Sequence, residues 1–431
     1  MSSLLHKPRI LFWPLGDAKL ESASDDAILA LDNLKQADLD ITAVKKMTWW
    51  EPTEIPKLAG TLRGKKFDMV VIFSATHGTV RCSTAIAQRF KLPLVIWALP
   101  TRYSLATSGI AAGYLRDKGR WVKLICAESG DEDVRATICS LAQAARANSQ
   151  CREKRIGIIG KLSPLMISLP YDLSLLKRKL GPTTHEISIM RVERGLKAVS
   201  NKEVSDAVTE YKQKFAVGVS DSALSKALRF QLAVRKIVQS DRLDAIALEC
   251  WTNLYPKYGV NPCLGHLDDL TVGCEGDIVS MSGCLIMREI NGVNPYLADI
   301  LSVDSKTGTI TLSHCAAPIS LAKDPAGVKI VERTDPKSKG KTAFTHFDFR
   351  EGFVTLARFY GQKLDKLHIA AGTLDSTGDF WGGIKLTVTP KGKWEDFLSH
   401  VSGNHYLVTY GDIRKELHLF AEWNGIEVIE D

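Results

Sequence analysis

Residues 69–73 read Met-Val-Val-Ile-Phe, and residues 92–97 read Leu-Pro-Leu-Val-Ile-Trp. Two further apolar runs of this kind occupy residues 9–13 and 122–126. Continuous apolar runs of this length predict strands that are buried on both faces of a sheet. Apolar residues at helical spacing lie around and between these runs, over residues 22–36, 82–90, 105–118 and 131–147. Strands that alternate with helices predict a parallel sheet with helices on both faces.

The same alternation begins again after a polar break at residues 148–154. Strands are expected at residues 155–160, 186–190 and 244–249, and helices at residues 171–180 and 202–239, the latter with a break near residues 217–220. This second half of the pattern is not a sequence repeat of the first. It predicts a second doubly wound domain.

From about residue 290 the pattern changes to short β-rich runs separated by Gly, Asp and Pro. They cover residues 307–312, 328–331, 353–359, 367–371, 383–388 and 405–410, and a helix is expected at residues 413–423. Such runs predict an antiparallel sheet or small barrel. The expected fold class is therefore α/β: two doubly wound α/β domains, residues 1–152 and 153–290, followed by a β-rich, barrel-like C-terminal domain, residues 291–431.

Composition excludes several classes of function. The formal charge of +7 comes from 56 basic and 49 acidic residues, and the basic ones form no stripe with interleaved aromatics, so no nucleic-acid partner is expected. The chain has nine cysteines, an odd number, and no two of them form a C-x-x-C pair. Several lie in apolar runs, such as the one that ends at Cys126. This usage is typical of reduced, buried thiols. No apolar segment approaches about eighteen residues, and residues 1–8 lack a long apolar run. We expect a cytoplasmic protein without a membrane partner.

Motifs of nucleotide and nucleophile sites are missing from the sequence. The turn at residues 157–160, Gly-Ile-Ile-Gly, lacks the G-x-G-x-x-G fingerprint, and neither a P-loop nor a G-x-S-x-G elbow occurs. His77 follows a predicted strand, where open α/β sheets place ligand-binding groups. It is either a substrate contact or a solvent-facing turn histidine.

Carboxylates and imidazoles gather in the second half of the chain. Glu275 and Asp299 each follow or lie in a short apolar run, His314 precedes Cys315, and His405 begins the last predicted strand. Carboxylate oxygens with an imidazole nitrogen suit Mn²⁺, Mg²⁺ or Co²⁺, and three protein ligands leave coordination positions open for a substrate. Each of these residue types, taken singly, more often has a surface or structural role.

The motifs around these residues resemble the L-fucose isomerase-like family, and more distantly the L-arabinose isomerases. The resemblance rests on Cys-Glu-Gly-Asp-Ile at residues 274–278, the later Asp299, His-Cys-x-x-Pro at residues 314–318 and Gly-Asn-His-Tyr at residues 403–406. It implies Glu275, Asp299 and His405 as metal ligands, the first from the second α/β domain and the others from the C-terminal domain. It also implies Mn²⁺ (or Mg²⁺ or Co²⁺), and a homo-oligomer, trimer or hexamer. His314 resembles a histidine of the arabinose branch, as a substrate contact or extra ligand.

The implied reaction is a divalent-metal-dependent ketol isomerisation, an interconversion of an aldose and a ketose through a cis-enediolate. Glu275 and Asp299 are expected to act as acid and base as well as ligands. Further polar or aromatic residues near turns are candidates for holding the sugar: Trp251, Trp381 and Asn404. Two alternatives stay open at this point. One is a metal-dependent isomerase, epimerase or lyase of a sulfo- or phospho-sugar, which basic residues such as Lys257 or Arg102 in the pocket would favour. The other is a sugar-binding protein without turnover.

Overall fold

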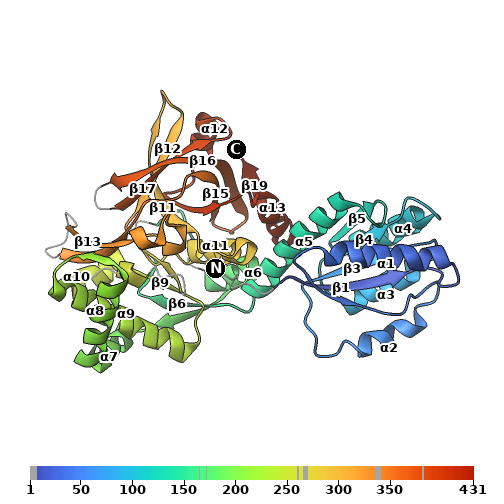
Figure 1. Cartoon of the computed structure of the whole chain (residues 1–431), viewed down its shortest axis with the longest axis horizontal. Helices are drawn as coiled ribbons and strands as arrows, with labels where there is room; N and C mark the ends of the chain where they lie inside the picture. Colours follow the sequence, from blue (N-terminus) through green and yellow to red (C-terminus); the bar gives the residue numbers. More distant parts are fainter. Residues whose placement is uncertain are drawn as a thin grey trace. The chain divides into compact units, whose positions relative to one another are not determined.

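The computed structural model describes residues 7–164, 166–170, 172–259, 262–265, 270–334, 341–380 and 383–431. The chain separates into two compact units, Met1–Ser149 and Gln150–Asp431. Figure 1 shows the helices and strands of each unit. The predicted domain limits at residues 152 and 290 stay a prediction.

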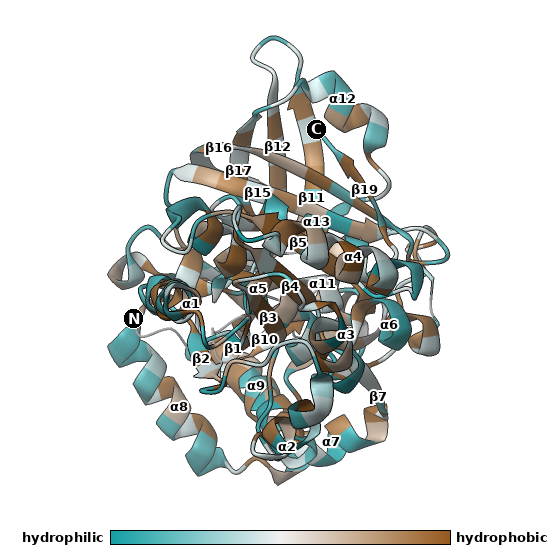
Figure 2. Cartoon of the chain, turned by 90° about the vertical axis from the view of Figure 1, so that its right-hand side faces the viewer, coloured by the Kyte–Doolittle hydropathy of each residue, from teal (hydrophilic) through white to brown (hydrophobic). Residues whose placement is uncertain are grey.

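The first unit holds a parallel sheet of five strands in the order β2-β1-β3-β4-β5. They are β1 (Arg9–Leu15), β2 (Asp40–Ala43), β3 (Met69–Ser74), β4 (Leu94–Ala98) and β5 (Val122–Cys126). The helices are α1 (Glu21–Lys35), η1 (Pro52–Glu54), α2 (Ile55–Gly60), α3 (Val80–Arg89), α4 (Ser104–Asp117) and α5 (Glu132–Cys151), and they lie on both faces of the sheet (Figure 2). The large side chains of Trp13 and Trp97 are fully buried. The predicted strands are confirmed. The short edge strand β2 escaped prediction because its sequence, Asp-Ile-Thr-Ala, is half polar.

The second unit begins with a parallel sheet in the order β10-β9-β6-β7. Its strands are β6 (Arg155–Ile159), β7 (Thr183–Ile187), β9 (Ala245–Leu248) and β10 (Thr271–Gly273). The helical elements are α6 (Leu173–Leu180), α7 (Ile189–Ala198), α8 (Asn201–Lys214), α9 (Asp221–Asp241), η2 (Cys250–Leu254), α10 (Tyr255–Tyr258), η3 (Pro262–Gly265) and α11 (Ile278–Asn291). The strand expected at residues 186–190 lies earlier, at β7, because residues 189–190 already belong to the amphipathic α7.

A closed antiparallel barrel follows, with strand order β15-β18-β11-β12-β17-β16 and a final pairing of β16 with β15. Its strands are β11 (Tyr296–Asp304), β12 (Thr309–His314), β15 (Gly352–Tyr360), β16 (Lys366–Phe380), β17 (Gly383–Pro390) and β18 (His405–Tyr410). The elements around it are η4 (Ile319–Leu321), η5 (Pro325–Gly327), α12 (Trp394–His400), α13 (Arg414–Asn424) and β19 (Glu427–Glu430), which pairs in parallel with β16. The two parallel sheets and this barrel confirm the predicted fold class.

Two details of the fold differ from expectation. The run at residues 328–331 forms β13 (Lys329–Thr334), which pairs with β14 (Lys341–His346) and β8 (Ala216–Gly218) in a separate small sheet and not in the barrel. The break predicted near residues 217–220 is therefore a strand as well as a helix boundary. Cys126, expected in a buried run, is exposed at the end of β5, whereas Cys82, Cys274 and Cys284 are buried.

Helix α11 joins the parallel sheet to the barrel, because it contacts β6 and β9 on one side and β15 and β18 on the other (Figure 1). Nearly all of its residues are buried. It begins directly after the turn that carries Glu275. Among the described residues, no helix has the length and apolar character needed to cross a membrane.

Candidate active site

A tight turn at the carboxyl end of β10 presents the side chain of Glu275. Glu275 and Gly276 both have left-handed backbone conformations, with φ of 60° and 66°. The backbone amide of Gly276 donates to the carbonyl of Leu248 at the end of β9, at 3.1 Å, and the amide of Ser163 donates to the carbonyl of Glu275 at 2.9 Å. These bonds fix Glu275 at the edge of the sheet where α/β folds bind ligands.

Only glycine fits at position 276. A Cβ atom there would lie 2.2 Å from the carbonyl oxygen of Lys161, and the positive φ also disfavours other residues. The sequence Glu-Gly is thus a requirement of the turn that carries the carboxylate. A non-glycine residue such as Glu275 at positive φ is uncommon, and such residues often occur at functional sites.

Three neighbouring barrel strands present the other polar groups. Asp299 of β11 pairs with His405 of β18 on one side and with Ser313 of β12 on the other, and His314 follows Ser313. The backbone amide of Ile300 also donates to the carbonyl of Asn404, at 3.1 Å. The barrel ladder therefore sets the spacing between these groups.

The candidate ligands predicted from the sequence come together in space. Donor atoms of Glu275, His314 and His405 all lie within 4.8 Å of one another. The Nε2 atom of His405 lies 3.6 Å from Oδ1 of Asp299, and Asn404 donates from Nδ2 to the same oxygen at 2.7 Å. The rings of His314 and His405 meet edge to face, with centroids 5.5 Å apart. His314 and His405 are buried, whereas Glu275 and Asp299 are partly exposed.

Asp277 holds His405 in one tautomer. Its Oδ2 atom lies 2.8 Å from Nδ1 of His405, and both side chains are fully buried. A carboxylate only accepts hydrogen bonds, so Nδ1 carries the hydrogen and Nε2 points toward Glu275 and Asp299. Among the described residues, Nε2 of His405 has no hydrogen-bond partner. Asp277 lies within the Cys-Glu-Gly-Asp-Ile motif, but the sequence alone indicates no role for it.

Electrostatics in the site favour positive charge. Burial raises the pKa of Glu275, and the negative charges of Asp299, Asp277 and Glu249 add to the rise, against the opposing charge of His405. Burial alone would lower the pKa of His405, but the hydrogen bond to Asp277 and the nearby carboxylates raise it. Burial likewise opposes ionisation of Asp277, yet its bond to His405 keeps its pKa below the usual value. The carboxylates thus outnumber the cations beside them.

Arg358 of β15 supports the site from inside the barrel. It is 2% exposed and donates from one guanidinium nitrogen to the carbonyl of His405, at 2.6 Å. A Cβ atom at Gly403 would lie 2.1 Å from this guanidinium, so the glycine of the Gly-Asn-His motif makes room for it. Burial lowers the pKa of Arg358. No motif singles out Arg358; its signal in the sequence is an arginine within the apolar run at residues 353–359.

The remaining predicted contacts lie elsewhere or outside the described residues. Trp381 and the side chain of Trp251 are outside them. His77 belongs to the first unit, where it is exposed, its carbonyl accepts from Trp49 Nε1 at 2.7 Å, and its ring packs against Trp49. Lys257 pairs with Glu193 at 2.7 Å and Arg102 with Asp26 at 2.7 Å. Their charges are therefore already partly compensated.

The donor set fits a divalent cation. Glu275 and Asp299 offer hard carboxylate oxygens, and His405 offers an unpartnered, buried nitrogen oriented by a carboxylate on its other side. His314 lies close enough to serve as a further ligand. The partial exposure of Glu275 and Asp299 leaves one side of the group accessible to a substrate.

Comparison with known proteins points to the same class of enzyme. No family model matches the chain. The chain is 24% identical over 390 residues to a sulfoquinovose isomerase of Priestia aryabhattai, covering 85% of this chain and 86% of the relative. A sulfoquinovose isomerase of Alkalicoccus urumqiensis is 22% identical over 84% of this chain and 86% of its own length. A sulfoquinovose isomerase of Clostridium sp. (strain MSTE9) is 24% identical over 83% of this chain and 85% of its own length. The predicted reaction class is confirmed: the chain is an isomerase, an intramolecular oxidoreductase.

Proposed function

We propose that this chain is a divalent-metal-dependent aldose–ketose isomerase of the L-fucose isomerase-like class, acting on a sulfonated aldose. Glu275, Asp299 and His405 are the proposed metal ligands, and His314 is a further ligand or a substrate contact. The observation that carries the proposal is the buried Nε2 of His405. It has no hydrogen-bond partner among the described residues and faces two carboxylates and a second imidazole.

The reaction moves a proton between C1 and C2 of the sugar and a hydrogen between O1 and O2, so reactant and product are isomers. A bound divalent cation would supply positive charge beside the two oxygens, which makes the C–H bond more acidic. Glu275 and Asp299 flank the position of His405 Nε2, and either carboxylate can take the proton from one carbon and return it to the next.

The sulfonated substrate is inferred from the relatives, all of which are named sulfoquinovose isomerases. Lys257 and Arg102, the basic residues considered from the sequence, are each paired with an acidic residue. They are therefore poor candidates for recognising a sulfonate.

The test follows hydrogen exchange on the sugar. The protein is stripped of metal with a chelator, reloaded with Mn²⁺ and incubated in D₂O with sulfoquinovose, or with glucose as the matching neutral sugar. Proton NMR then reports exchange at C2 and any ketose. We expect exchange only with Mn²⁺ and faster exchange on the sulfonated sugar. Full turnover by metal-free protein would contradict the metal site, and equal rates on both sugars would contradict the substrate.

Variants connect the reaction to the named residues. Glu275→Gln should lower turnover by about 100-fold or more, since it removes a proton-transfer group. His405→Ala should lose Mn²⁺ binding. Glu193→Gln removes a carboxylate paired with Lys257 and serves as the control, with unchanged turnover expected. Wild-type turnover by Glu275→Gln would exclude the proposed role of that carboxylate.

A further inference from the structure

A second group of imidazole and carboxylate side chains lies where β19 joins the barrel. His368 of β16 contacts Asp431 through Nε2, 2.8 Å from Oδ2. His400, the last residue of α12, contacts the same carboxylate through Nδ1, at 2.9 Å from Oδ1 and 3.2 Å from Oδ2. Donor atoms of the three residues all lie within 4.8 Å of one another. Side chains from two elements, β16 and α12, thus converge on one carboxylate that directly follows a third, β19.

The environment of His368 holds its ring in a fixed orientation. The side chain is fully buried, with its ring against Phe397 and Tyr406, at centroid distances of 5.2 and 5.5 Å. Its second nitrogen, Nδ1, lies 2.5 Å from the hydroxyl of Tyr406. Histidines that bind metals usually have such a partner on the nitrogen that faces away from the ion.

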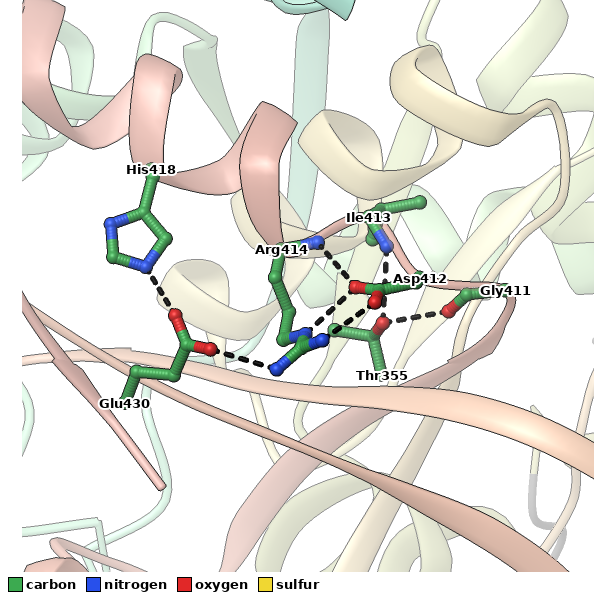
Figure 3. A network of polar contacts seen from close by, with 7 residues as sticks. All are labelled: Thr355, Gly411, Asp412, Ile413, Arg414, His418 and Glu430. Atoms are coloured by element: carbon green, nitrogen blue, oxygen red, sulfur yellow. Dashed lines mark hydrogen bonds and ion pairs between the residues drawn. The ribbon is translucent and has the colours of Figure 1, made fainter. Parts of the chain in front are cut away.

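Asp431 is held in place by the strand before it. Glu430 forms an ion pair with Arg414 at 2.8 Å and contacts His418 (Figure 3). Arg414 and His418 both belong to α13, and Arg414 also pairs with Asp412. The backbone amide of Asp431 donates to the carbonyl of Ile369, at 3.0 Å. Neighbouring side chains of an extended chain point to opposite sides. Anchoring Glu430 on α13 therefore turns Asp431 toward His368.

We propose that His368, His400 and Asp431 form a second metal site, separate from the candidate active site, for a divalent transition-metal ion such as Zn²⁺. Two imidazole nitrogens and one carboxylate are a common donor set for Zn²⁺, and three protein ligands leave a fourth position open. The side chain of His400 is 40% exposed, which gives the ion a way in from solvent. The ion would tie α12 and β19 to β16 and so act on stability, not on the sugar.

The competing explanation is a hydrogen-bond network without metal. Tyr406 can donate to Nδ1 of His368, and both imidazoles can then donate to Asp431. Arg358 also acts on His368, and its charge opposes a cation there, although Asp431 has the larger influence. Only metal binding itself separates the two explanations.

The experiment counts bound Zn²⁺ in full-length protein that carries His405→Gln, so that the candidate active site contributes as little as possible. Equilibrium dialysis against buffered Zn²⁺, followed by elemental analysis, gives ions per chain. Adding His400→Gln should remove one ion per chain, or weaken its binding by at least about tenfold. The half-exposed position of His400 makes this change compatible with folding. The difference between the two proteins does not depend on whether the proposed isomerase site is correct.

His418→Gln is the matched control. His418 is also half-exposed and also contacts a carboxylate, Glu430, but among the described residues it belongs to no group of three potential metal ligands. It should leave the Zn²⁺ count and the Zn²⁺-dependent rise in melting temperature unchanged, whereas His400→Gln should abolish that rise. Equal Zn²⁺ counts with and without His400→Gln would overturn the proposal in favour of the hydrogen-bond network.

Discussion

Asp277 uses one carboxylate for two tasks. It caps the first turn of α11, because Oδ1 accepts from the amide of Ser280 at 2.8 Å. Its other oxygen accepts from the Ser280 hydroxyl at 2.6 Å and lies 2.8 Å from His405. The residue that starts the helix therefore also orients the imidazole, so the position of α11 and the chemistry of the site are linked through a single side chain.

Asp277→Asn should reverse the tautomer of His405. The amide oxygen can keep the cap, but the amide nitrogen then faces Nδ1 as a donor, so the ring hydrogen moves to Nε2 and blocks metal binding. We expect about 10- to 100-fold weaker Mn²⁺ binding, measured by chelator competition. Asp172→Asn is the control, since the Asp172 side chain caps α6 by accepting from the amide of Leu175, and no histidine among the described residues is hydrogen-bonded to it. Unchanged Mn²⁺ affinity in Asp277→Asn would contradict the assigned role.

Gly276→Ala tests the turn that carries Glu275. The new Cβ would collide with the carbonyl of Lys161 at 2.2 Å, in addition to the strain of a positive φ. Gly411→Ala has the strain alone, because φ is 87° and no atom lies within 4 Å of the added carbon. In urea unfolding, the free energy of unfolding of the control should fall by about 1–2 kcal/mol. For Gly276→Ala it should fall clearly further, and enzymatic activity should be lost as well. Equal decreases in the two variants would show that the turn adapts to the added carbon.

Motifs in the sequence single out the candidate donors, but not the residues that support them. Glu275, Asp299 and His405 come from motifs, and the structure brings them together with His314. Asp277 and Arg358 act through contacts with His405 that span 128 and 47 positions of sequence, and no local pattern reveals such pairs. Buried partners of this kind become visible only when the strands are placed.

Among the elements, α11 packs closely against the barrel. A Cβ atom at Gly283 would lie 2.6 Å from Leu407 and 3.1 Å from Phe359, both on barrel strands. Gly283 thus permits α11 to approach β15 and β18. The approach matters for the site, because Asp277 at the start of α11 reaches His405 at the start of β18.

Two glycine substitutions within helices should have opposite effects. Gly283→Ala should destabilise the protein by about 1–3 kcal/mol, because it overfills a packed contact. Gly113→Ala in α4 meets no atom within 4 Å and should stabilise by about 0.5–1 kcal/mol through its better helix propensity. Thermal unfolding of both variants measures the difference. A stable Gly283→Ala protein would mean that Leu407 moves aside without cost.

Elements with a clear apolar period were predictable, and elements defined by their partners were not. The buried strands β1, β3 and β4 are predictable because their sequences are continuous apolar runs. The polar strand β7 depends on its pairing with β6, and β13 joins a small sheet through β8, far away in sequence. Tertiary context decides such strands, because pairing and burial outweigh local preference.

For the whole molecule, the division into Met1–Ser149 and Gln150–Asp431 has a thermodynamic consequence. Glu275, Asp299, His314 and His405 all belong to the second unit. Mn²⁺ should therefore stabilise that unit alone. A free Mn²⁺ concentration one hundred times the dissociation constant should raise its free energy of unfolding by about 2.7 kcal/mol. Scanning calorimetry should show two transitions, of which one responds to metal. A single transition that shifts as a whole would show that the units unfold together.

The barrel also sets the order in which an active chain is made. Glu275 and His405 lie 130 positions apart (405 − 275), and β18 fits between β11 and β15. On the ribosome, β11 is therefore synthesised long before its neighbour β18. Until β18 pairs with it, β11 has an unpaired edge, which is prone to aggregation. Protein synthesis interrupted before residue 405 leaves both parallel sheets able to form and the isomerase inactive. Activity in a growing chain would thus mark the moment at which the barrel closes.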